Sequence, residues 1–217
     1  MEILIVDDHR LVREMLGQFL TGERIATRVL EAERGEEAVR RLRAESVQLV
    51  LMDINMPGIG GIEATRRARR SGFGGWVLAL THYDHWLYMR HAFNAGANGY
   101  LVKDVSSEQL RHAIERVKVG GRPVHPASLL QDYVTADIDS DGAADHPFAR
   151  LSSREFEVVR LLMQGYQQRE IASILGRSAK TIWSHRSEIH RKLQCTSDCE
   201  VLRLAVRFGL HHEAPVA

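Results

Sequence analysis

Cysteines and long apolar runs are scarce in this sequence of 217 residues. The two cysteines, Cys195 and Cys199, are too few for a disulfide framework and favour reduced thiols, although a redox switch at this pair is the alternative. No apolar run approaches the ~20 residues that a membrane-spanning helix needs. Because Glu2 follows Met1 directly and Asp7 comes soon after, we expect no signal peptide. These absences predict a cytoplasmic protein with no membrane partner.

Net charge is also nearly absent, but the charges are unevenly distributed. Residues 1–120 carry 17 Lys and Arg against 16 Asp and Glu, residues 121–147 carry 1 against 5, and residues 148–217 carry 11 against 7. The chain is longer than most single domains. We therefore predict two domains, 1–120 and 148–217, joined by an acidic linker over 121–147 that contains a short helix at 126–134. Only the basic last part is expected to bind a polyanion.

Apolar runs and amphipathic segments alternate in the first of these domains. The expected strands are residues 3–6, 28–32, 49–53, 76–81 and 99–103. The expected helices are residues 11–20, 35–42, 62–70, 86–95 and 106–120. Strands that alternate with helices in this way predict an α/β fold with a doubly wound five-stranded parallel sheet.

Polar residues follow the carboxyl ends of these strands, where open α/β sheets place their chemistry. The five positions are Asp7, Asp8, Asp53, Thr81 and Lys103. Taken singly, an aspartate after a strand is usually a turn former or a helix cap, and a lysine is usually on the surface. Together, clustered carboxylates favour Mg²⁺, while a lysine and a hydroxyl suit a phosphoryl group. One of the carboxylates would be the nucleophile that forms an acyl phosphate.

The motifs at these strand ends resemble the receiver domain of two-component response regulators. They are Val6-Asp7-Asp8-His9, Met52-Asp53-Ile54-Asn55-Met56-Pro57-Gly58, Leu80-Thr81 and Gly99-Tyr100-Leu101-Val102-Lys103-Asp104. The resemblance implies that Asp53 accepts a phosphoryl group from a histidine kinase or a small phosphodonor. It also implies that Asp8, Asp53 and the backbone carbonyl of Asn55 hold Mg²⁺, with Asp7 acting through water.

The same resemblance implies roles for three further residues. Thr81 and Lys103 would bind the phosphoryl oxygens, and Tyr100 matches the aromatic residue that swings inward when the threonine moves. Such a receiver is no enzyme in the usual sense, because it catalyses only its own phosphotransfer and dephosphorylation. Gly60-Gly61 stands where Asp-Gly is common in the family, so a more flexible loop is expected there.

The pattern of residues 148–217 predicts a small all-α domain of four helices. Ser152 and Glu155 form a capping box for the first helix. A short helix over 168–175, a turn containing glycine and a basic helix over 179–193 follow the helix-turn-helix plan, and a fourth helix spans 198–208.

This second domain resembles the DNA-binding domain of LuxR-type (NarL/FixJ-like) regulators. The resemblance rests on Leu151-Ser152-Ser153-Arg154-Glu155, Glu170-Ile171-Ala172, Lys180-Thr181-Ile182, His185-Arg186, Ile189 and Lys192-Leu193. It implies that double-stranded DNA is contacted by Lys180, Thr181, Trp183, Ser184, Arg186, Ser187 and Lys192. Trp183 is unusual at its position, and it packs either on a thymine methyl or sugar or on the protein itself.

The expected function is that of a two-component transcriptional regulator that is switched by phosphorylation of Asp53. By family analogy, the active protein is a homodimer whose DNA-binding domains pair through the last helix at Val201, Leu202 and Ala205. Those three side chains also suit the core of the domain. The alternatives are a constitutive DNA-binding regulator with a silent receiver, and a small hydrolase that forms an aspartyl phosphate.

Overall fold

The computed structural model describes residues 1–120, Pro126 and residues 146–210. The chain divides into two compact units, Met1–Leu130 and Gln131–Ala217. Most of the expected linker over 121–147, with its acidic tract, lies outside the described residues, and so does the helix expected over 126–134 except at Pro126. Within the described part of the chain, no helix combines the length and the apolar character that a membrane span requires.

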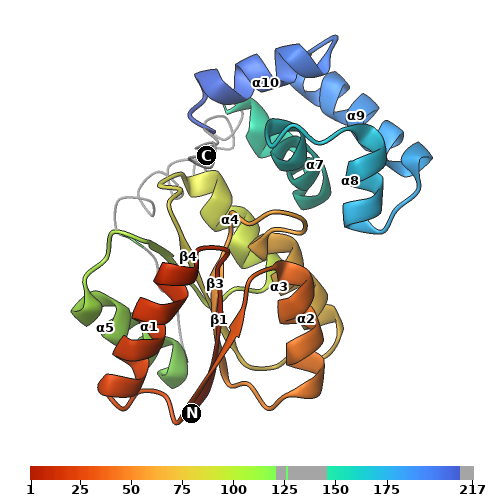
Figure 1. Ribbon diagram of the computed structural model, residues 1–217. Coiled ribbons are helices and arrows are strands. Elements are labelled where there is room, and N and C mark those ends of the chain that lie inside the picture. Colours follow the sequence, from red (N-terminus) through yellow and green to blue (C-terminus); the bar gives the residue numbers. More distant parts are fainter. Residues whose placement is uncertain (121–125, 127–145, 211–217) are drawn as a thin grey trace. The chain divides into compact units, whose positions relative to one another are not determined.

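A five-stranded parallel sheet forms the centre of the first unit (Figure 1). The strands are β1 (Glu2–Val6), β2 (Arg28–Ala32), β3 (Leu49–Asp53), β4 (Trp76–Thr81) and β5 (Gly99–Val102). Their order across the sheet is β2-β1-β3-β4-β5, so that β1, β3 and β4 are interior strands. The doubly wound parallel fold expected from the sequence is confirmed.

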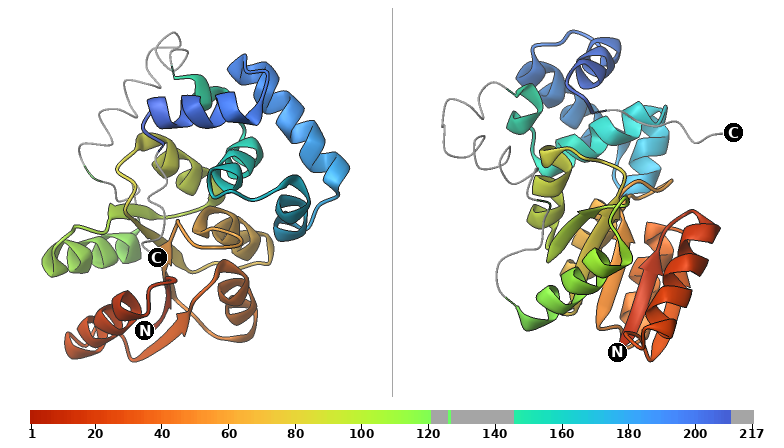
Figure 2. Two further views of the ribbon diagram at one scale, coloured as in Figure 1. Left: turned by 45° about the horizontal axis from the view of Figure 1, so that its top comes forward. Right: turned by 90° about the vertical axis from the view of Figure 1, so that its left-hand side faces the viewer.

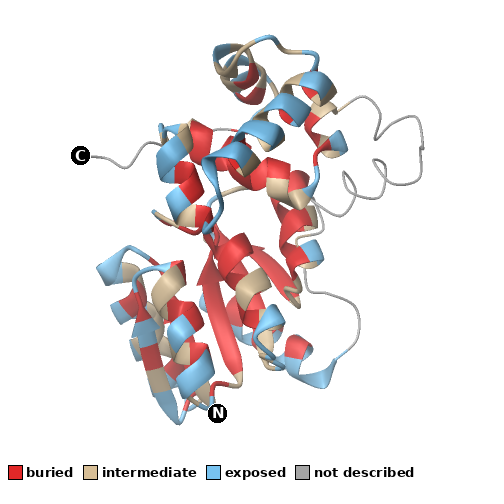
Figure 3. Ribbon diagram, turned by 90° about the vertical axis from the view of Figure 1, so that its right-hand side faces the viewer, coloured by how far each residue is buried: buried red, intermediate tan, exposed pale blue. Residues whose placement is uncertain are grey.

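Helices cover both faces of this sheet. They are α1 (Arg10–Gly22), α2 (Gly35–Ala44), α3 (Gly61–Arg70), α4 (Trp86–Ala95) and α5 (Ser107–Val119). Helices α1 and α5 lie on one face, and α2, α3 and α4 lie on the other (Figures 1 and 2). The two layers explain why all five residues of the interior strand β3 are buried, and why its apolar residues do not alternate with polar ones (Figure 3).

Strand register aligns the polar residues at one edge of the sheet. Val6 pairs with Met52, so Asp7 and Asp53 each come one position later on neighbouring strands. Thr81 ends β4 and pairs with Val102, the last residue of β5, and Lys103 comes directly after it. Side chains from four strands therefore meet where the chain reverses its direction across the sheet.

All regular elements of the second unit over residues 146–210 are helices, as expected. Its elements are a 3₁₀ helix η1 (Pro147–Arg150) and the α-helices α7 (Ser153–Met163), α8 (Gln168–Leu175), α9 (Ala179–Leu193) and α10 (Asp198–Arg207). The 3₁₀ helix was not predicted from the sequence. It begins at the last residue of the expected linker and buries Phe148 completely.

Local sequence signals set the ends of the helices in this unit. Ser152 and Glu155 form the predicted capping box at the start of α7. Gly176 ends α8 with a left-handed φ of 62°, a conformation that glycine adopts without strain. Ser178 then caps α9 by accepting a hydrogen bond from the Thr181 backbone N–H. The short turn between α8 and α9 completes the predicted helix-turn-helix.

Candidate functional site

A buried lysine joins two buried carboxylates at the carboxyl edge of the sheet. Lys103 Nζ lies 2.6 Å from Asp7 Oδ2 and 2.9 Å from Asp53 Oδ2. Asp7 and Asp53 are 2% and 3% exposed, and the side chain of Lys103 is 7% exposed. Three of the five polar residues expected at the strand ends are therefore in direct contact, although they lie up to 96 positions apart in the sequence.

The electrostatics of this group follow from its burial. Burial raises the pKa of Asp53 to about 6 and Asp7 adds to the rise, whereas Lys103 and the Asn55 backbone N–H act in the opposite direction. For Lys103, burial acts to lower the pKa, but the charges of Asp53 and Asp7 outweigh it and the pKa is raised. The pocket thus holds the positive charge of Lys103 beside a buried carboxyl group whose pKa is raised to about 6.

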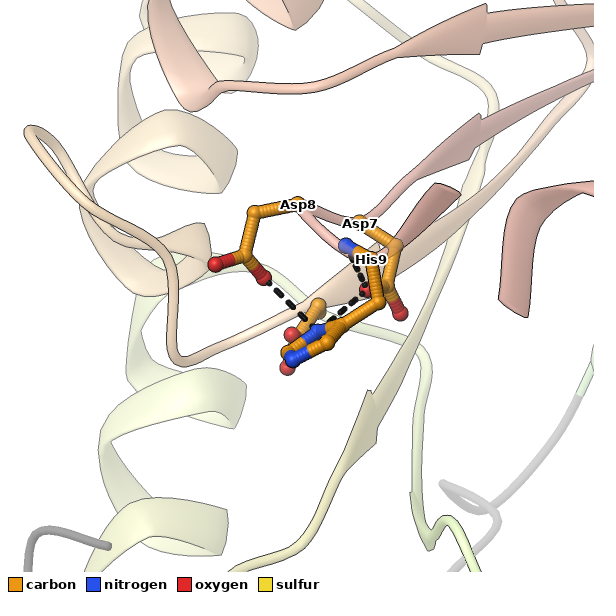
Figure 4. Close-up of side chains that lie close together, drawn as sticks. Asp7, Asp8 and His9 are labelled. Atoms are coloured by element: carbon orange, nitrogen blue, oxygen red, sulfur yellow. Dashed lines mark hydrogen bonds and ion pairs between the residues drawn. The ribbon is translucent and has the colours of Figure 1, made fainter. Parts of the chain in front are cut away.

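Asp8 and His9 lie at the outer side of the same pocket (Figure 4). The Nδ1 atom of His9 is 3.2 Å from Asp7 Oδ1 and 3.1 Å from Asp8 Oδ1. One ligand atom from each of Asp7, Asp8, His9 and Asp53 lies within 4.8 Å of the others. This predominantly oxygen-donor set fits a hard divalent cation such as Mg²⁺. The sequence did not indicate that His9 would face the acidic residues.

Thr81 and Tyr100 are connected to each other through the backbone of Tyr83. The Tyr83 N–H donates to Thr81 Oγ1 at 3.2 Å, and the Tyr100 hydroxyl donates to the Tyr83 carbonyl at 2.7 Å. Both Thr81 and Tyr100 are fully buried, and burial raises the pKa of Tyr100 well above its ordinary value. Tyr83 also stacks on Tyr88 of α4 with ring centroids 3.9 Å apart. Sequence reasoning missed Tyr83, because nothing in its local pattern marks it.

Arg13 is a second residue that sequence reasoning missed. It is 4% exposed on α1 and donates from Nη1 to the Asp7 carbonyl at 2.8 Å. Its other nitrogens bind Glu31 at 3.0 Å and Glu33 at 2.8 Å. The guanidinium therefore holds the backbone that carries the first acidic residue of the pocket. The sequence offers one sign of this role, which is a basic residue on the side of an amphipathic helix that faces the protein interior.

The loop after Asp53 is more tightly held than the sequence suggested. A Cβ atom at Gly61 would lie 2.0 Å from the Asp53 carbonyl oxygen, so only glycine fits there. Gly60 caps α3 without a side-chain hydrogen bond. The Ile59 N–H instead donates to Glu36 Oε1 of α2 at 3.0 Å. A side chain from a neighbouring helix thus restrains the loop that the missing aspartate was expected to leave flexible.

The exposed side of α9 carries most of the residues expected to contact DNA. Ile182, Ile189 and Leu193 form its buried side. Of the residues expected to contact DNA, the exposed ones are Lys180, Trp183, Ser184 and Ser187, and Thr181 is half-buried. This separation of apolar and polar faces leaves a long helical surface available to a partner.

Two of the residues expected to contact DNA have ion-pair partners within the second unit. Arg186 binds the Asp198 carboxylate through two nitrogens and donates from Nη1 to Gln168 Oε1 at 2.9 Å. Lys192 Nζ lies 2.9 Å and 2.7 Å from the two carboxylate oxygens of Glu155. Both cations hold helices together, so the cationic surface of α9 is smaller than its sequence suggests.

The last helix combines a buried and an exposed side. Val201 and Ala205 are fully buried, whereas Leu202 is only partly buried. Cys199 lies in α10 and is exposed, and Cys195 precedes that helix. The two thiols are unbridged and do not share one helix.

Comparison with known proteins assigns both units. The family model of the response regulator receiver domain matches residues 3–115, and that of the LuxR family of bacterial regulatory proteins matches residues 149–205. The chain is a response regulator. Response regulator UvrY of Escherichia coli K12 is 36% identical over 208 residues, which cover 96% of this chain and 94% of UvrY. Response regulator GacA of Pseudomonas aeruginosa PAO1 is 34% identical over 96% of this chain and 97% of GacA.

Solved structures of RcsB share the fold of this response regulator. RcsB from Salmonella enterica serovar Typhimurium, bound to promoter rprA in the presence of the phosphomimetic BeF3-, aligns with a TM-score of 0.71 and 25% identity over 95% of this chain and 98% of that one. A further Salmonella typhimurium RcsB structure aligns with a TM-score of 0.76 and 24% identity over 96% and 98%. The response regulator is a two-component transcriptional regulator with a LuxR-type helix-turn-helix domain, and its family is not one of conventional enzymes.

Proposed function

We propose that Asp53 accepts a phosphoryl group from a histidine kinase and that its phosphorylation controls dimerisation and DNA binding. The observation that carries the proposal is the contact of a buried Asp53 with the buried Lys103 at 2.9 Å. A carboxylate oxygen of Asp53 attacks phosphorus, and the bond from phosphorus to the kinase histidine nitrogen breaks. Lys103 binds the phosphoryl oxygens and offsets their charge.

Mg²⁺ is the proposed cofactor of this step. Asp8, Asp53 and the Asn55 backbone carbonyl would hold it, with Asp7 acting through water, and it would supply neutralising charge beside the phosphoryl oxygens. The cluster of Asp7, Asp8 and Asp53 ligand atoms within 4.8 Å supports this assignment. Arg13 fixes the backbone at Asp7, and Glu36 fixes the loop beyond Asn55.

The response to phosphorylation is proposed to pass through Thr81 and Tyr100. The Thr81 hydroxyl would turn toward the phosphoryl oxygens, which breaks its hydrogen bond with the Tyr83 N–H. The Tyr83 carbonyl also accepts a hydrogen bond from Tyr100, and the Tyr83 ring stacks on Tyr88 of α4. A shift of Tyr83 would therefore move both Tyr100 and the first turn of α4. A charge in the pocket would thereby bias a receiver surface between two states.

The proposed output is promoter binding by a homodimer in the cytoplasm. Helix α9 would enter the major groove, with Lys180, Thr181, Trp183, Ser184 and Ser187 facing DNA. Arg186 and Lys192 would act mainly through the ion pairs that shape the domain. Val201, Leu202 and Ala205 of α10 remain the proposed dimer contacts, with the partly exposed Leu202 the best placed of them. The similarity to RcsB bound to promoter rprA supports the promoter-binding part of this proposal.

Mass spectrometry of the full chain after incubation with Mg²⁺ and a small phosphodonor tests the chemistry. We expect wild type to gain one phosphoryl group and Asp53→Asn to gain none. Asp104→Asn is the matched control, because Asp104 is an exposed aspartate outside the acidic cluster, and it should be labelled like wild type. Equal labelling of Asp53→Asn and wild type would contradict the assignment of Asp53.

A further inference from the structure

A large indole is exposed on the surface of α9. Trp183 is 60% exposed, although its neighbour Ile182 is fully buried. Burial of apolar surface stabilises a fold by about 25 cal/mol for each Å² removed from water, and an exposed ring lacks this stabilisation. The side chain therefore does not serve the core of its own domain, which leaves a partner as the reason for its exposure.

Small polar residues and one lysine surround this indole. Lys180 lies three positions before Trp183 and Ser187 four positions after it, so the three share one side of the helix. Ser184 follows on the same exposed surface. In the described part of the chain, Lys180 makes no ion pair. We call Lys180, Trp183, Ser184 and Ser187 the indole face.

The indole face lacks the side chains that read purines by paired hydrogen bonds. Arg186 is held by Asp198 and Gln168, and Lys192 is held by Glu155. Helix α9 contains no asparagine or glutamine, the residues that bind adenine with two hydrogen bonds. Serine hydroxyls donate or accept and so select weakly between bases. The apolar ring is the most distinctive chemical feature that this surface offers to a base edge.

We propose that Trp183 is a specificity-determining residue that recognises thymine through its C5-methyl group in the major groove. The proposal rests on the proposed function, since it requires α9 to enter that groove. Thymine is the base that presents an apolar group there. Lys180, three residues toward the start of α9, binds a phosphate and sets the position of the helix. Each half-site of the bound DNA therefore contains a thymine whose methyl group contacts the indole.

Replacing thymine by deoxyuridine tests this contact, because it removes the methyl group and leaves the hydrogen-bonding edge unchanged. A binding site is first selected from random DNA with the full chain, Mg²⁺ and beryllofluoride at fixed salt. Each thymine of that site is then replaced singly by deoxyuridine, and thymines outside the protected region serve as controls. Affinity is measured for wild type and Trp183→Ala, and thermal unfolding verifies that the variant is folded.

We expect one deoxyuridine per half-site to weaken wild-type binding about fourfold, the effect of one methyl group. Trp183→Ala should bind thymine and deoxyuridine DNA equally. Wild-type binding that is unchanged by every deoxyuridine, or a selected site without thymine, would overturn the proposal while leaving DNA binding intact. An equal loss of affinity by Trp183→Ala for every DNA, with no deoxyuridine effect in wild type, would instead place the indole on the sugar-phosphate backbone. Absence of any DNA binding would refute the proposed function itself.

Discussion

Paired charged side chains have different roles in the two units. In the receiver, Lys103 contacts Asp7 and Asp53 inside the pocket, so paired charges form the candidate reactive site itself. In the helix-turn-helix unit, the paired cations Arg186 and Lys192 hold the scaffold, and the exposed Lys180 makes no ion pair with any residue that the structure describes. Ion pairing therefore lies within the candidate reactive site in the receiver, whereas in the helix-turn-helix unit it links the helices of the scaffold.

The largest effect on stability is expected from Arg69→Ala in the receiver. Arg69 is half-buried and donates to the carbonyls of Phe73, Gly75 and Gly96 and to the side chain of Asn98, at 2.6 to 3.0 Å. Burial lowers its pKa, and its loss removes a donor from all four acceptors, of which Asn98 Oδ1 keeps a hydrogen bond from the Val77 N–H. Unfolding by urea should show that the free energy of unfolding falls by about 2–4 kcal/mol. Arg70→Ala at the next, exposed position is the control and should change little; equal losses would contradict the account.

Arg186→Ala should have the next largest effect and should act on the second unit. Asp198 and Gln168 lose their shared partner in this variant. We expect the free energy of unfolding to fall by about 1–2 kcal/mol, because the ion pair of Arg186 with Asp198 is only partly exposed. Arg191→Ala is the matched control, since its pair with Glu188 lies on the surface. A stable Arg186→Ala protein with weakened DNA binding would return Arg186 to the DNA-contacting set.

A smaller, pH-dependent effect is expected at Glu155. Its pKa is lowered from 4.5, since the hydrogen bonds from Lys192 and the capping box outweigh the effect of burial. A carboxylate with a depressed folded pKa adds stability above pH 4.5 that is lost as the pH falls through the folded value. Thermal unfolding should show this loss in wild type and a weaker one in Glu155→Gln. Glu188→Gln is the comparison, because the hydrogen bond from Arg191 also lowers the pKa of Glu188, but that pair lies on the surface and its removal should change the profile less. An unchanged profile in Glu155→Gln would refute the role of the pair with Lys192.

The smallest effect on stability, within about 0.5 kcal/mol, is expected for Lys180→Ala. Its consequence should appear in DNA binding, because one phosphate contact is lost. The slope of log affinity against log salt should fall by about one for each protein chain bound. Lys192→Ala offers the contrast: it should lose stability while keeping the salt slope. The reverse pattern in the two variants would contradict the division of the α9 cations into one that contacts DNA and one that holds the scaffold.

Most of the receiver pocket followed from the sequence, because strand order alone brings the residues after β1, β3, β4 and β5 to one edge. The roles of Arg13, Glu36 and Tyr83 did not follow. Arg13 binds Asp7 through a backbone carbonyl, and Glu36 accepts from the backbone N–H of Ile59. Any residue offers such backbone groups, so no motif marks these contacts.

The helix-turn-helix surface was less predictable for a related reason. Amphipathic spacing correctly separated Ile182 and Ile189 from the exposed residues. It could not show which cations are engaged, since Asp198 lies 12 positions from Arg186 and Glu155 lies 37 from Lys192. Pairing across such distances depends on how helices pack, which the periodicity of a single helix does not encode.

The most direct test of the central claim is DNA affinity and oligomeric state at fixed salt, with and without Mg²⁺ and beryllofluoride, for wild type and Asp53→Ala. The account predicts that the mimic promotes dimers or tighter DNA binding in wild type and has no effect on Asp53→Ala. If both proteins bind DNA and neither responds, the claim is contradicted, and the chain is a constitutive DNA-binding regulator with a silent receiver.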